Sequence, residues 1–372
     1  MSDIAITIEQ IAGIEPHPQA DRLEIAKILG TQTIVPKGQY RVGEPVVYFP
    51  PDICLPEDEA NWLGVFKYLK SGGRVAACRL RGVPSYGFVT PVPPRLASMV
   101  DHPDADLTEH YRAWKYEPPV RVYRGHGGGT GEVWGSLARE PENFHHYTDI
   151  QAYWKHHREF EDGILVRVTE KIHGTNSRVG LLKVRDEWDF YAGSHKKCRR
   201  GSDHEGRECV YWHPFNIPGV MDLLTDLCNL YDWGMESEGP QNDVILFGEL
   251  FGPGVQDLDY GVTVGEIGWR CYDCMVNGQY LDWPILVAYC LAHGVQMVPV
   301  IYSGPFKANL VESWTNGPST VSEAIKSKFK GREGCVITPH IETRTSKLGR
   351  LILKSVSADY RDRKGASDEG EL

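Results

Sequence analysis

Residues 4 to 95 alternate between short apolar stretches and turn residues. The stretches are rich in β-branched and aromatic side chains, which predict strands, and Gly30, Gly38 and Gly43 supply turns between them. The predicted strands cover residues 4–14, 23–29, 31–36, 45–49 and 87–92. Several short strands at this spacing predict a small β-barrel.

The second half of the chain mixes two hydrophobic periods. Apolar residues three and four positions apart predict a helix over 218–231, and further helices are expected over 149–160 and 284–293. Strands are expected over residues 164–169, 177–184, 188–192, 244–247, 334–338 and 351–356. The pattern predicts an α+β domain built on antiparallel sheet.

A glycine-rich segment, residues 124–131, separates the two halves. It has no lysine at the position that a phosphate-binding loop requires, so a flexible linker is favoured over a phosphate cradle. We therefore expect an N-terminal domain over 1–120, a linker over 121–148 and a C-terminal domain over 149–372. The polar tail, residues 364–372, is expected to fray.

Composition limits the class of protein. The chain has no apolar run of the roughly 20 residues that cross a bilayer, and its start lacks a secretory signal pattern. We expect an intracellular, cytoplasmic protein without membrane contact. Nine cysteines without repeating spacing predict free thiols, and Cys271 and Cys274 lack the second pair that a zinc site needs.

The net charge of −10 argues against a protein that coats nucleic acid without discrimination. Basic residues nevertheless cluster in the second half, over 195–200, 326–332, 344–350 and 361–364. Each cluster is consistent with a solvated surface, and together they are equally consistent with a directed anion-binding face.

The candidate chemistry begins at Lys171, which lies at the end of a predicted strand and is followed by His173 and Gly174. The strand end holds the lysine in place, and the glycine lets the backbone approach a phosphate closely. A lysine amine is a nucleophile only when deprotonated, which nearby cations favour. A lone lysine and glycine at this spacing is weak evidence.

An ordered set of polar residues follows Lys171. Glu249 comes after a buried strand, Tyr272 stands beside a carboxylate, Glu333 begins a strand and Lys354 ends one. A nucleotidyl-transfer site needs these parts: a nucleophile, a ribose acceptor, a base-stacking ring, a metal-organising carboxylate and a cation for the α-phosphate.

The order of these motifs resembles that of the covalent nucleotidyltransferases. The segments EKIHGTN (170–176), FGELFGPG (247–254), EGCVI (333–337) and LKSVSADYRDRK (353–364) resemble the RNA ligase family of the Deinococcus type. Segments 14–25, 46–52, 81–87 and 115–119 resemble the N-terminal OB-like domain of that family. The resemblance spans nearly the whole chain.

The resemblance implies an α+β fold in which an N-terminal OB-like β-barrel, binding nucleic acid, precedes an ATP-grasp-like nucleotidyltransferase domain on antiparallel sheets. It implies an ATP-dependent RNA ligase that uses Mg²⁺ or Mn²⁺ and seals 3′-hydroxyl and 5′-phosphate ends through lysyl-AMP. The expected partner is RNA, as nicked duplex in RNA repair, and no obligate protein partner is expected.

The resemblance also implies roles for individual residues. The catalytic residues are Lys171, Lys354 and Glu333. The ATP-binding residues are Glu170, His173, Gly174, Lys196, Glu249, Tyr272 and Lys354. Glu249 is expected to hold the ribose, Tyr272 to stack on adenine and Lys354 to hold the α-phosphate. Glu333 and Glu249 are the expected metal-binding residues.

The chain departs from the wider superfamily at two positions. His173 stands where many ligases have aspartate, and a neutral imidazole brings no negative charge to the metal. Ile352 stands where related enzymes often have a lysine, and Lys347 or Arg350 are alternative cations.

The basic residue that binds the ribose after the first motif is also open. The candidates are His195, Lys196 and Arg199, and Lys196 is slightly favoured. Trp269 remains an alternative to Tyr272 as the stacking ring.

Other functions remain possible from the sequence. A capping guanylyltransferase or a DNA ligase shares the lysine chemistry, but both carry the OB domain after the nucleotidyltransferase domain. A non-catalytic OB-type RNA-binding protein leaves Lys171, Glu249, Glu333 and Lys354 unexplained.

Overall fold

The structure is a computed structural model. It describes residues 4–102, 105–116, 137–202, 206, 208–231, 235–236, 242–253, 255–256 and 258–363. The predicted glycine-rich linker segment and the tail over 364–372 lie outside the described residues.

The N-terminal unit, residues 4–116, is built on a five-stranded sheet in the order β3-β2-β1-β4-β8. The strands are β1 (Thr7–Pro16), β2 (Leu23–Ile28), β3 (Thr31–Pro36), β4 (Pro45–Phe49) and β8 (Phe88–Pro91). All neighbours in it are antiparallel. Thr33 Oγ1 of β3 donates a hydrogen bond of 2.9 Å to the carbonyl of Gly87, which directly precedes β8. This bond joins the two edge strands of the sheet, β3 and β8. The predicted small β-barrel is confirmed.

Short elements complete this unit. They are β5 (Ile53–Cys54), α1 (Glu57–Trp62), β6 (Cys78–Leu80), β7 (Val83–Ser85) and β9 (Trp114–Lys115). Apolar side chains of β4, β5 and α1, among them Val47, Phe49, Ile53 and Ala60, form a buried core. The chain between β4 and β8 therefore covers one end of the barrel.

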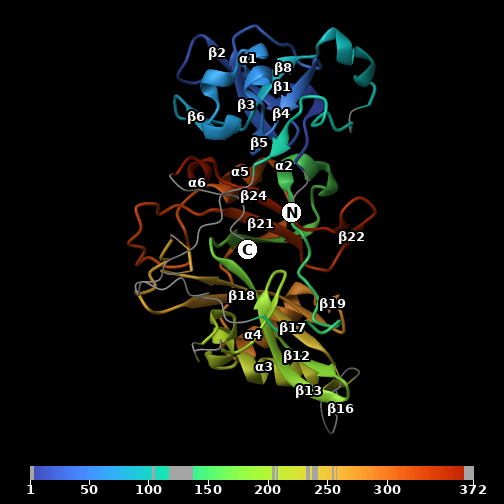
Figure 1. Cartoon of the computed structure of the whole chain (residues 1–372), viewed down its shortest axis with the longest axis vertical. Helices are drawn as coiled ribbons and strands as arrows, with labels where there is room; N and C mark the ends of the chain where they lie inside the picture. The colour runs from blue at the N-terminus through green and yellow to red at the C-terminus, as the bar shows by residue number, and fades with distance from the viewer. Residues whose placement is uncertain are drawn as a thin grey trace.

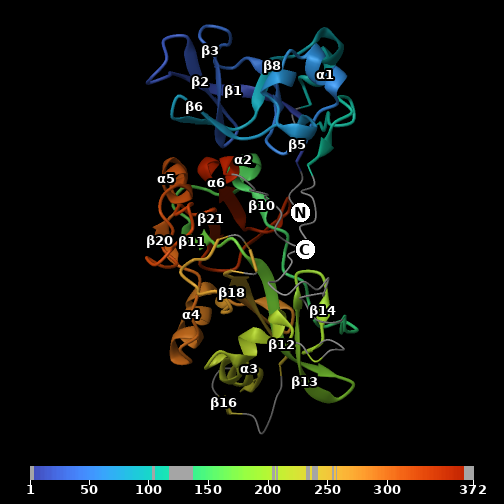
Figure 2. The same cartoon turned by 60° about the vertical axis from the view of Figure 1, so that its left-hand side comes forward.

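The C-terminal unit, residues 137–363, begins with a sheet in the order β10-β24-β21-β11-β20. The strands are β10 (Gln151–Ala152), β11 (Leu165–Lys171), β20 (Val300–Pro305), β21 (Gly334–Pro339) and β24 (Leu353–Val356). Only the short β10–β24 pair is parallel among the described pairs of this sheet. The helices α2 (Tyr153–His156), α5 (Val311–Thr315) and α6 (Ala358–Asp362) lie between this sheet and the N-terminal unit (Figures 1 and 2).

A second sheet has the order β14-β13-β12-β17-β18-β19. The strands are β12 (Thr175–Val184), β13 (Glu187–Ser194), β14 (Cys198–Arg199), β17 (Val244–Phe251), β18 (Gly268–Val276) and β19 (Gln279–Tyr280). The helices α3 (Val220–Cys228) and α4 (Trp283–Ala292) cover its outer face, where Leu223, Leu227 and Leu286 share a buried core with Leu246. Two small strand pairs are β15–β16 (Leu230–Tyr231 and Met235–Glu236) and β22–β23 (Arg344–Thr345 and Gly349–Arg350).

The molecule is thus elongated, with the barrel, the first sheet and the second sheet stacked in turn (Figure 1). The predicted α+β fold and its strands at 164–169, 244–247 and 334–338 are confirmed. The helix expected over 149–160 is shorter, because residues 151 and 152 pair with β24 as β10 before the chain turns into α2. Residues 137–148, expected to be linker, instead pack on the second sheet, where Phe144 and Tyr147 are buried.

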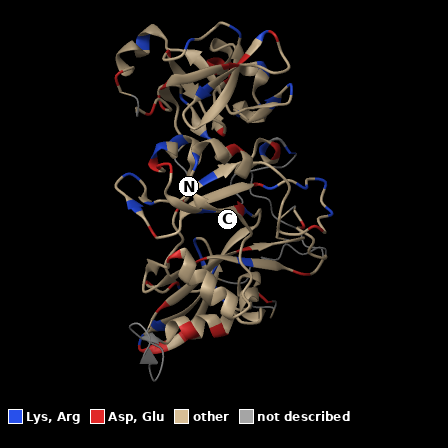
Figure 3. Cartoon of the chain, turned by 180° about the vertical axis from the view of Figure 1, so that it is seen from behind, with Lys and Arg blue, Asp and Glu red and all other residues tan. Residues whose placement is uncertain are grey.

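Three further expectations concern the surface and the cysteines. All nine cysteines are free thiols, as predicted. Within the described part of the chain, no helix is long and apolar enough to cross a membrane. Seen from behind, Lys and Arg are interspersed with Asp and Glu over both units (Figure 3), so the directed anion-binding face stays a prediction.

Candidate active site

The alternation of side chains along β11 builds one wall of a cavity between the two sheets. Residues two apart on a strand share a face, so Arg167, Thr169 and Lys171 point the same way. The register pairs Thr169 with Val336 of β21, and Val336 with Lys354 of β24. Lys171 and Lys354 therefore line the same cavity although 183 positions separate them (354 − 171).

The second sheet supplies the opposite wall through Asn176, Glu249 and Tyr272. Asn176 of β12 pairs directly with Glu249 of β17. The register between β17 and β18 shifts after Phe247, which is a β-bulge. Bulges redirect side chains beside functional sites. Side chains from three motifs that are far apart in the sequence therefore line one cavity.

Tyr272 is the aromatic ring of this wall, and Trp269 is not. The Tyr272 hydroxyl accepts a hydrogen bond from the Asn176 side-chain amide, and the ring meets Tyr147 edge-on with centroids 5.0 Å apart. Trp269 is buried in the core on the outer face, packed over Gly248. Tyr272 therefore remains the candidate for stacking on a base.

The nucleophile candidate Lys171 forms an ion pair with Glu333, with 2.7 Å between Nζ and Oε1. Glu333 is 2% exposed and directly precedes Gly334, which pairs with Lys171 across β11 and β21. A carboxylate this close favours the ammonium form of the lysine. If Lys171 is the nucleophile, the charge of Glu333 must be engaged elsewhere before the amine attacks.

His173 lies on the other side of Glu333 and is held by two tyrosines. Its backbone N–H donates to the Tyr260 hydroxyl at 2.7 Å, and its Nδ1 shares a 2.7 Å hydrogen bond with the Tyr360 hydroxyl. Nδ1 is 3.8 Å from Glu333 Oε2. Burial and then the charge of Glu333 raise the pKa of Tyr260 well above its ordinary value, which keeps its hydroxyl protonated. The imidazole thus has a fixed orientation beside the ion pair.

Gly174 is required by packing against the second sheet. A Cβ at this position would lie 2.1 Å from the Leu250 carbonyl oxygen and 2.9 Å from Glu249 Cγ. Any larger residue would push β17 away and displace Glu249. Close packing against Leu250 and Glu249 is therefore sufficient to explain why position 174 is glycine. The role of Gly174 in binding ATP stays a prediction.

Glu170 is occupied by contacts within the chain. Its carboxylate accepts hydrogen bonds from Ser319 Oγ at 2.5 Å, from Thr320 N at 2.6 Å and from Thr320 Oγ1 at 2.7 Å. Glu170 therefore anchors the loop that contains Ser319 and Thr320 at the end of β11. Its predicted part in ATP binding is not tested by these contacts.

Of the three basic candidates after the first motif, His195 lines the cavity. Its Nε2 is 3.5 Å from Asp149 Oδ1, another residue of the cavity wall. Lys196 is exposed in the turn between β13 and β14 and is absent from this wall. His195 therefore lines the cavity and Lys196 does not, and the role expected of Lys196 stays a prediction.

Arg350 is committed to structure rather than to the cavity. It bonds Asp273 at 2.8 Å and Glu342 at 2.8 Å, and its guanidinium lies over the Tyr280 ring at 3.4 Å. Although burial lowers the pKa of Arg350, Asp273 raises it well above its ordinary value. Lys347 is exposed between β22 and β23. Neither alternative to a lysine at position 352 lines the cavity.

Arg167 does line the cavity, and the sequence analysis missed it. It pairs with Thr338 on β21, and Thr338 and Ile352 line the same cavity. Arg167 is 3% exposed, and its guanidinium lies over the Trp283 ring, 4.3 Å from the centroid. Its Nη2 is 3.6 Å from Asp273 Oδ2. Its Nη1 has no hydrogen bond among the described residues. A signal was available, because an arginine four residues before Lys171 on a strand must share its face.

Comparison with known proteins supplies the family context. A model of the RNA ligase family matches residues 164–356, and a model of an OB-fold domain matches residues 5–92. Among curated proteins, no sequence matches the chain.

Solved structures with the same fold come from Naegleria gruberi RNA ligase. The form with PPi has a TM-score of 0.68 at 21% identity, covering 96% of this chain and 98% of that chain. A mutant with AMP and Mn has a TM-score of 0.69 at 21% identity with the same coverage. A mutant without ligand has a TM-score of 0.68 over 97% of this chain and 98% of that chain.

Proposed function

The chain belongs to the RNA ligase family, and from that premise we propose that it is an ATP-dependent ligase that joins RNA 3′-hydroxyl and 5′-phosphate ends through AMP carried on Lys171. One observation carries the proposal. Lys171 ends a strand in the family-matched segment, 2.7 Å from Glu333, and lines a cavity with Glu249, Tyr272 and Lys354.

The proposed reaction has three displacements at phosphorus. The Lys171 amine attacks the α-phosphorus of ATP, a P–N bond forms and pyrophosphate leaves. The 5′-phosphate of RNA then attacks that phosphorus, the P–N bond breaks, and the lysine amine leaves and takes a proton. Finally the RNA 3′-hydroxyl attacks the 5′-phosphorus, loses its proton and releases AMP. Such displacements depend on positioning and charge neutralisation.

The cavity residues divide these tasks in the proposal. Glu249 accepts hydrogen bonds from the ribose, Tyr272 stacks on adenine and Lys354 neutralises the α-phosphate. ATP is supported as the nucleotide because Naegleria gruberi RNA ligase, which shares this fold, was solved with ATP and Mn and with AMP and Mn.

A divalent cation, Mg²⁺ or Mn²⁺, would supply charge neutralisation at the phosphates. Glu333 and Glu249 provide hard oxygen donors, and Glu333 Oε2 is buried without a hydrogen bond among the described residues. No group of three or more potential ligands occurs in the described chain. A buried carboxylate oxygen without a hydrogen bond fits a cation that keeps most of its waters, as Mg²⁺ commonly does. Engagement of Glu333 would also release Lys171 from its ion pair.

The N-terminal unit is the proposed RNA-binding domain. We propose an OB-like domain over 1–120 and a nucleotidyltransferase domain over 149–372. Within the proposed linker over 121–148, residues 137–148 pack on the second sheet. A five-stranded barrel of this type binds nucleic acid in many proteins. The proposed substrate is RNA nicked within a duplex, in an intracellular repair reaction.

Arg167 is proposed as the cation that replaces the missing lysine at Ile352. Arg167→Met keeps an unbranched apolar stem of similar size but removes the charge. Because one phosphate contact is lost, we expect the rate of protein adenylylation to fall roughly 10- to 100-fold. The melting temperature is expected to fall as well, since Arg167 is 3.6 Å from the buried Asp273. An adenylylation rate equal to that of the native chain would refute this role.

The proposed function is tested by nucleotide and substrate together. With α-labelled ATP and Mg²⁺ the protein is expected to gain label without RNA, whereas α-labelled GTP is expected to give none. The labelled protein should then seal a nick between RNA strands that carry 3′-hydroxyl and 5′-phosphate ends. Label from GTP would indicate a capping enzyme, and RNA binding without any label would indicate a non-catalytic protein.

A further inference from the structure

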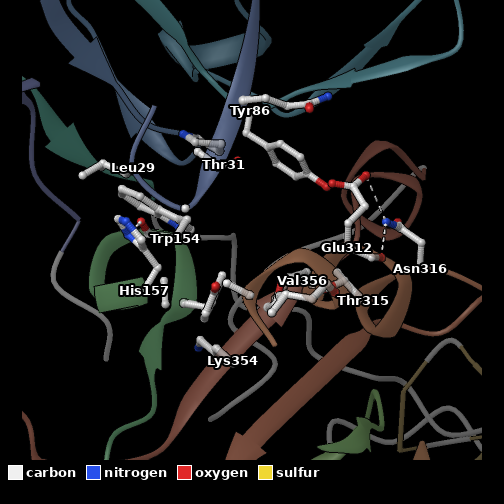
Figure 4. A pocket seen from close by; sticks show the side chains of 18 of the residues that line it. Leu29, Thr31, Tyr86, Trp154, His157, Glu312, Thr315, Asn316, Lys354 and Val356 are labelled. Carbon is white, nitrogen blue, oxygen red and sulfur yellow. Dashed lines mark hydrogen bonds between the residues drawn. The ribbon is translucent and has the colours of Figure 1, made fainter. Parts of the chain in front are cut away.

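A second cavity lies between the N-terminal unit and the first sheet (Figure 4). Its volume is about 410 Å³. Pockets that hold small organic ligands span roughly 300–1,000 Å³. The N-terminal unit contributes Lys27 and residues 29–32, and the C-terminal unit contributes parts of α2, α5 and β24. The cavity therefore exists only while the two units are docked.

The docking is close and has defined contacts. The Gly30 N–H donates a 3.0 Å hydrogen bond to the Trp154 carbonyl, and a Cβ at Gly30 would lie 2.7 Å from the Cβ of His157. Arg361 Nη1 donates to Asp52 Oδ2 at 2.8 Å across the same interface. These contacts hold the two halves of the cavity wall in register.

Aromatic and polar groups occupy opposite sides of this cavity. Trp154 and His157 lie on one side, and burial lowers the pKa of His157, so its ring is neutral at pH 7. On the other side the Tyr86 hydroxyl points toward the Glu312 carboxylate, and Asn316 lies beside it (Figure 4). Burial, and then Glu312, raise the pKa of Tyr86 to about 12, so its hydroxyl remains a donor. Flat rings facing donors and acceptors suit a nucleoside.

Cations complete the cavity. Lys27 is positioned by a 2.8 Å hydrogen bond from its Nζ to Gln32 Oε1 and by an ion pair of 3.3 Å with Glu15. Arg361 lies in the wall and is held by its pair with Asp52. Lys354 lines both this cavity and the one that contains Lys171. A phosphate bound at the Lys354 end would therefore lie next to the position expected for the α-phosphate of AMP.

We propose that the cavity between the units binds the terminal nucleotide of the RNA strand that carries the 5′-phosphate. Its base would lie against Trp154 and His157, and its phosphate would point toward Lys354. The inference rests on the proposed ligase function and adds the strand and its subsite. A 5′-phosphate brings a negative charge that Lys354 attracts directly and that Lys27 and Arg361 attract from the rest of the wall. A 3′-hydroxyl end brings no charge at its terminus.

The test uses the whole chain with Lys27→Ala and Glu312→Gln, and Lys37→Ala as the matched control, since Lys37 is exposed in the same unit and outside the cavity. Each protein is first labelled with AMP and then mixed with a 5′-phosphorylated oligoribonucleotide. We expect normal labelling, but half-maximal AMP transfer at roughly tenfold higher RNA concentration for the two cavity variants. Lys27→Arg should restore transfer, because it keeps the charge.

Two outcomes would overturn the inference while leaving the ligase function intact. One is AMP transfer by both cavity variants at the native RNA concentration. The other is a defect confined to the joining of pre-adenylylated RNA to a separate 3′-hydroxyl strand, which would assign the cavity to that strand. Failure of the native chain to take label from ATP, or to pass it to RNA, would instead overturn the proposed function and this inference with it.

Discussion

Lys171→Arg protein is expected to take up no label from α-labelled ATP and to leave nicked RNA unsealed. Arginine stays protonated at any working pH and cannot act as the nucleophile, yet it can keep the ion pair with Glu333. The ion pair is important because Glu333 is 2% exposed. Removing its cationic partner would leave a buried, unpaired carboxylate and lower the free energy of unfolding by about 3–5 kcal/mol. Lys171→Ala is expected to lose activity equally but also to unfold at a lower temperature.

Lys171→Arg protein should still join pre-adenylylated RNA to a 3′-hydroxyl strand, because the joining step forms no covalent bond to Lys171. Lys183→Ala is the matched control, because Lys183 is exposed on the same unit and pairs only with the exposed Asp186 at 3.6 Å among its recorded ion pairs. Sealing of ordinary nicked RNA with ATP by Lys171→Arg would contradict the assignment of the nucleophile.

Glu333→Gln is expected to slow adenylylation by about 10²- to 10³-fold, the range seen when one preorganised electrostatic partner is removed from an active site. The substitution keeps the size of the side chain but removes the charge that we propose organises the metal. Loss of the ion pair with Lys171 would by itself favour the free amine, so the expected slowing reports the role of Glu333 at the metal. Single-turnover label uptake at saturating ATP and Mg²⁺ measures the effect.

Glu323→Gln is the control for this prediction, because Glu323 is an exposed glutamate ten positions earlier (333 − 323). Circular dichroism melting of both variants separates a catalytic loss from a loss of fold. A rate for Glu333→Gln within twofold of the native rate would remove Glu333 from the catalytic set.

Much of the fold follows from local pattern. The five strands of the barrel were indicated by runs of β-branched residues, and α3 by apolar residues at helical spacing. The helix expected over 284–293 is α4. The errors came from long-range pairing. The sequence around residues 151 and 152 does not predict a strand, but these residues pair with the edge of β24. The linker prediction rested on the glycine-rich residues 124–131 and was extended to 148, whereas Phe144 and Tyr147 are buried against the second sheet.

The site was predictable where a sequence motif lies on a strand, although only Lys171 ends its strand, whereas Glu249 and Tyr272 lie within theirs. Lys171, Glu249, Tyr272 and Lys354 line one cavity as the order of motifs implied, while Glu333 reaches it through its ion pair. Packing partners were not predictable, because they come from distant segments. For example, Ser319 and Thr320 donate hydrogen bonds to Glu170, about 150 positions earlier in the chain. No local sequence pattern predicts these contacts.

The most direct test of the account is to map the site of AMP attachment. The native chain is incubated with α-labelled ATP and Mg²⁺ without RNA, digested, and the labelled peptide identified by mass spectrometry. The account predicts one adduct, on Lys171, that disappears when pyrophosphate or 5′-phosphorylated RNA is added. Label on another residue, or no covalent label on AMP-free protein, would contradict it.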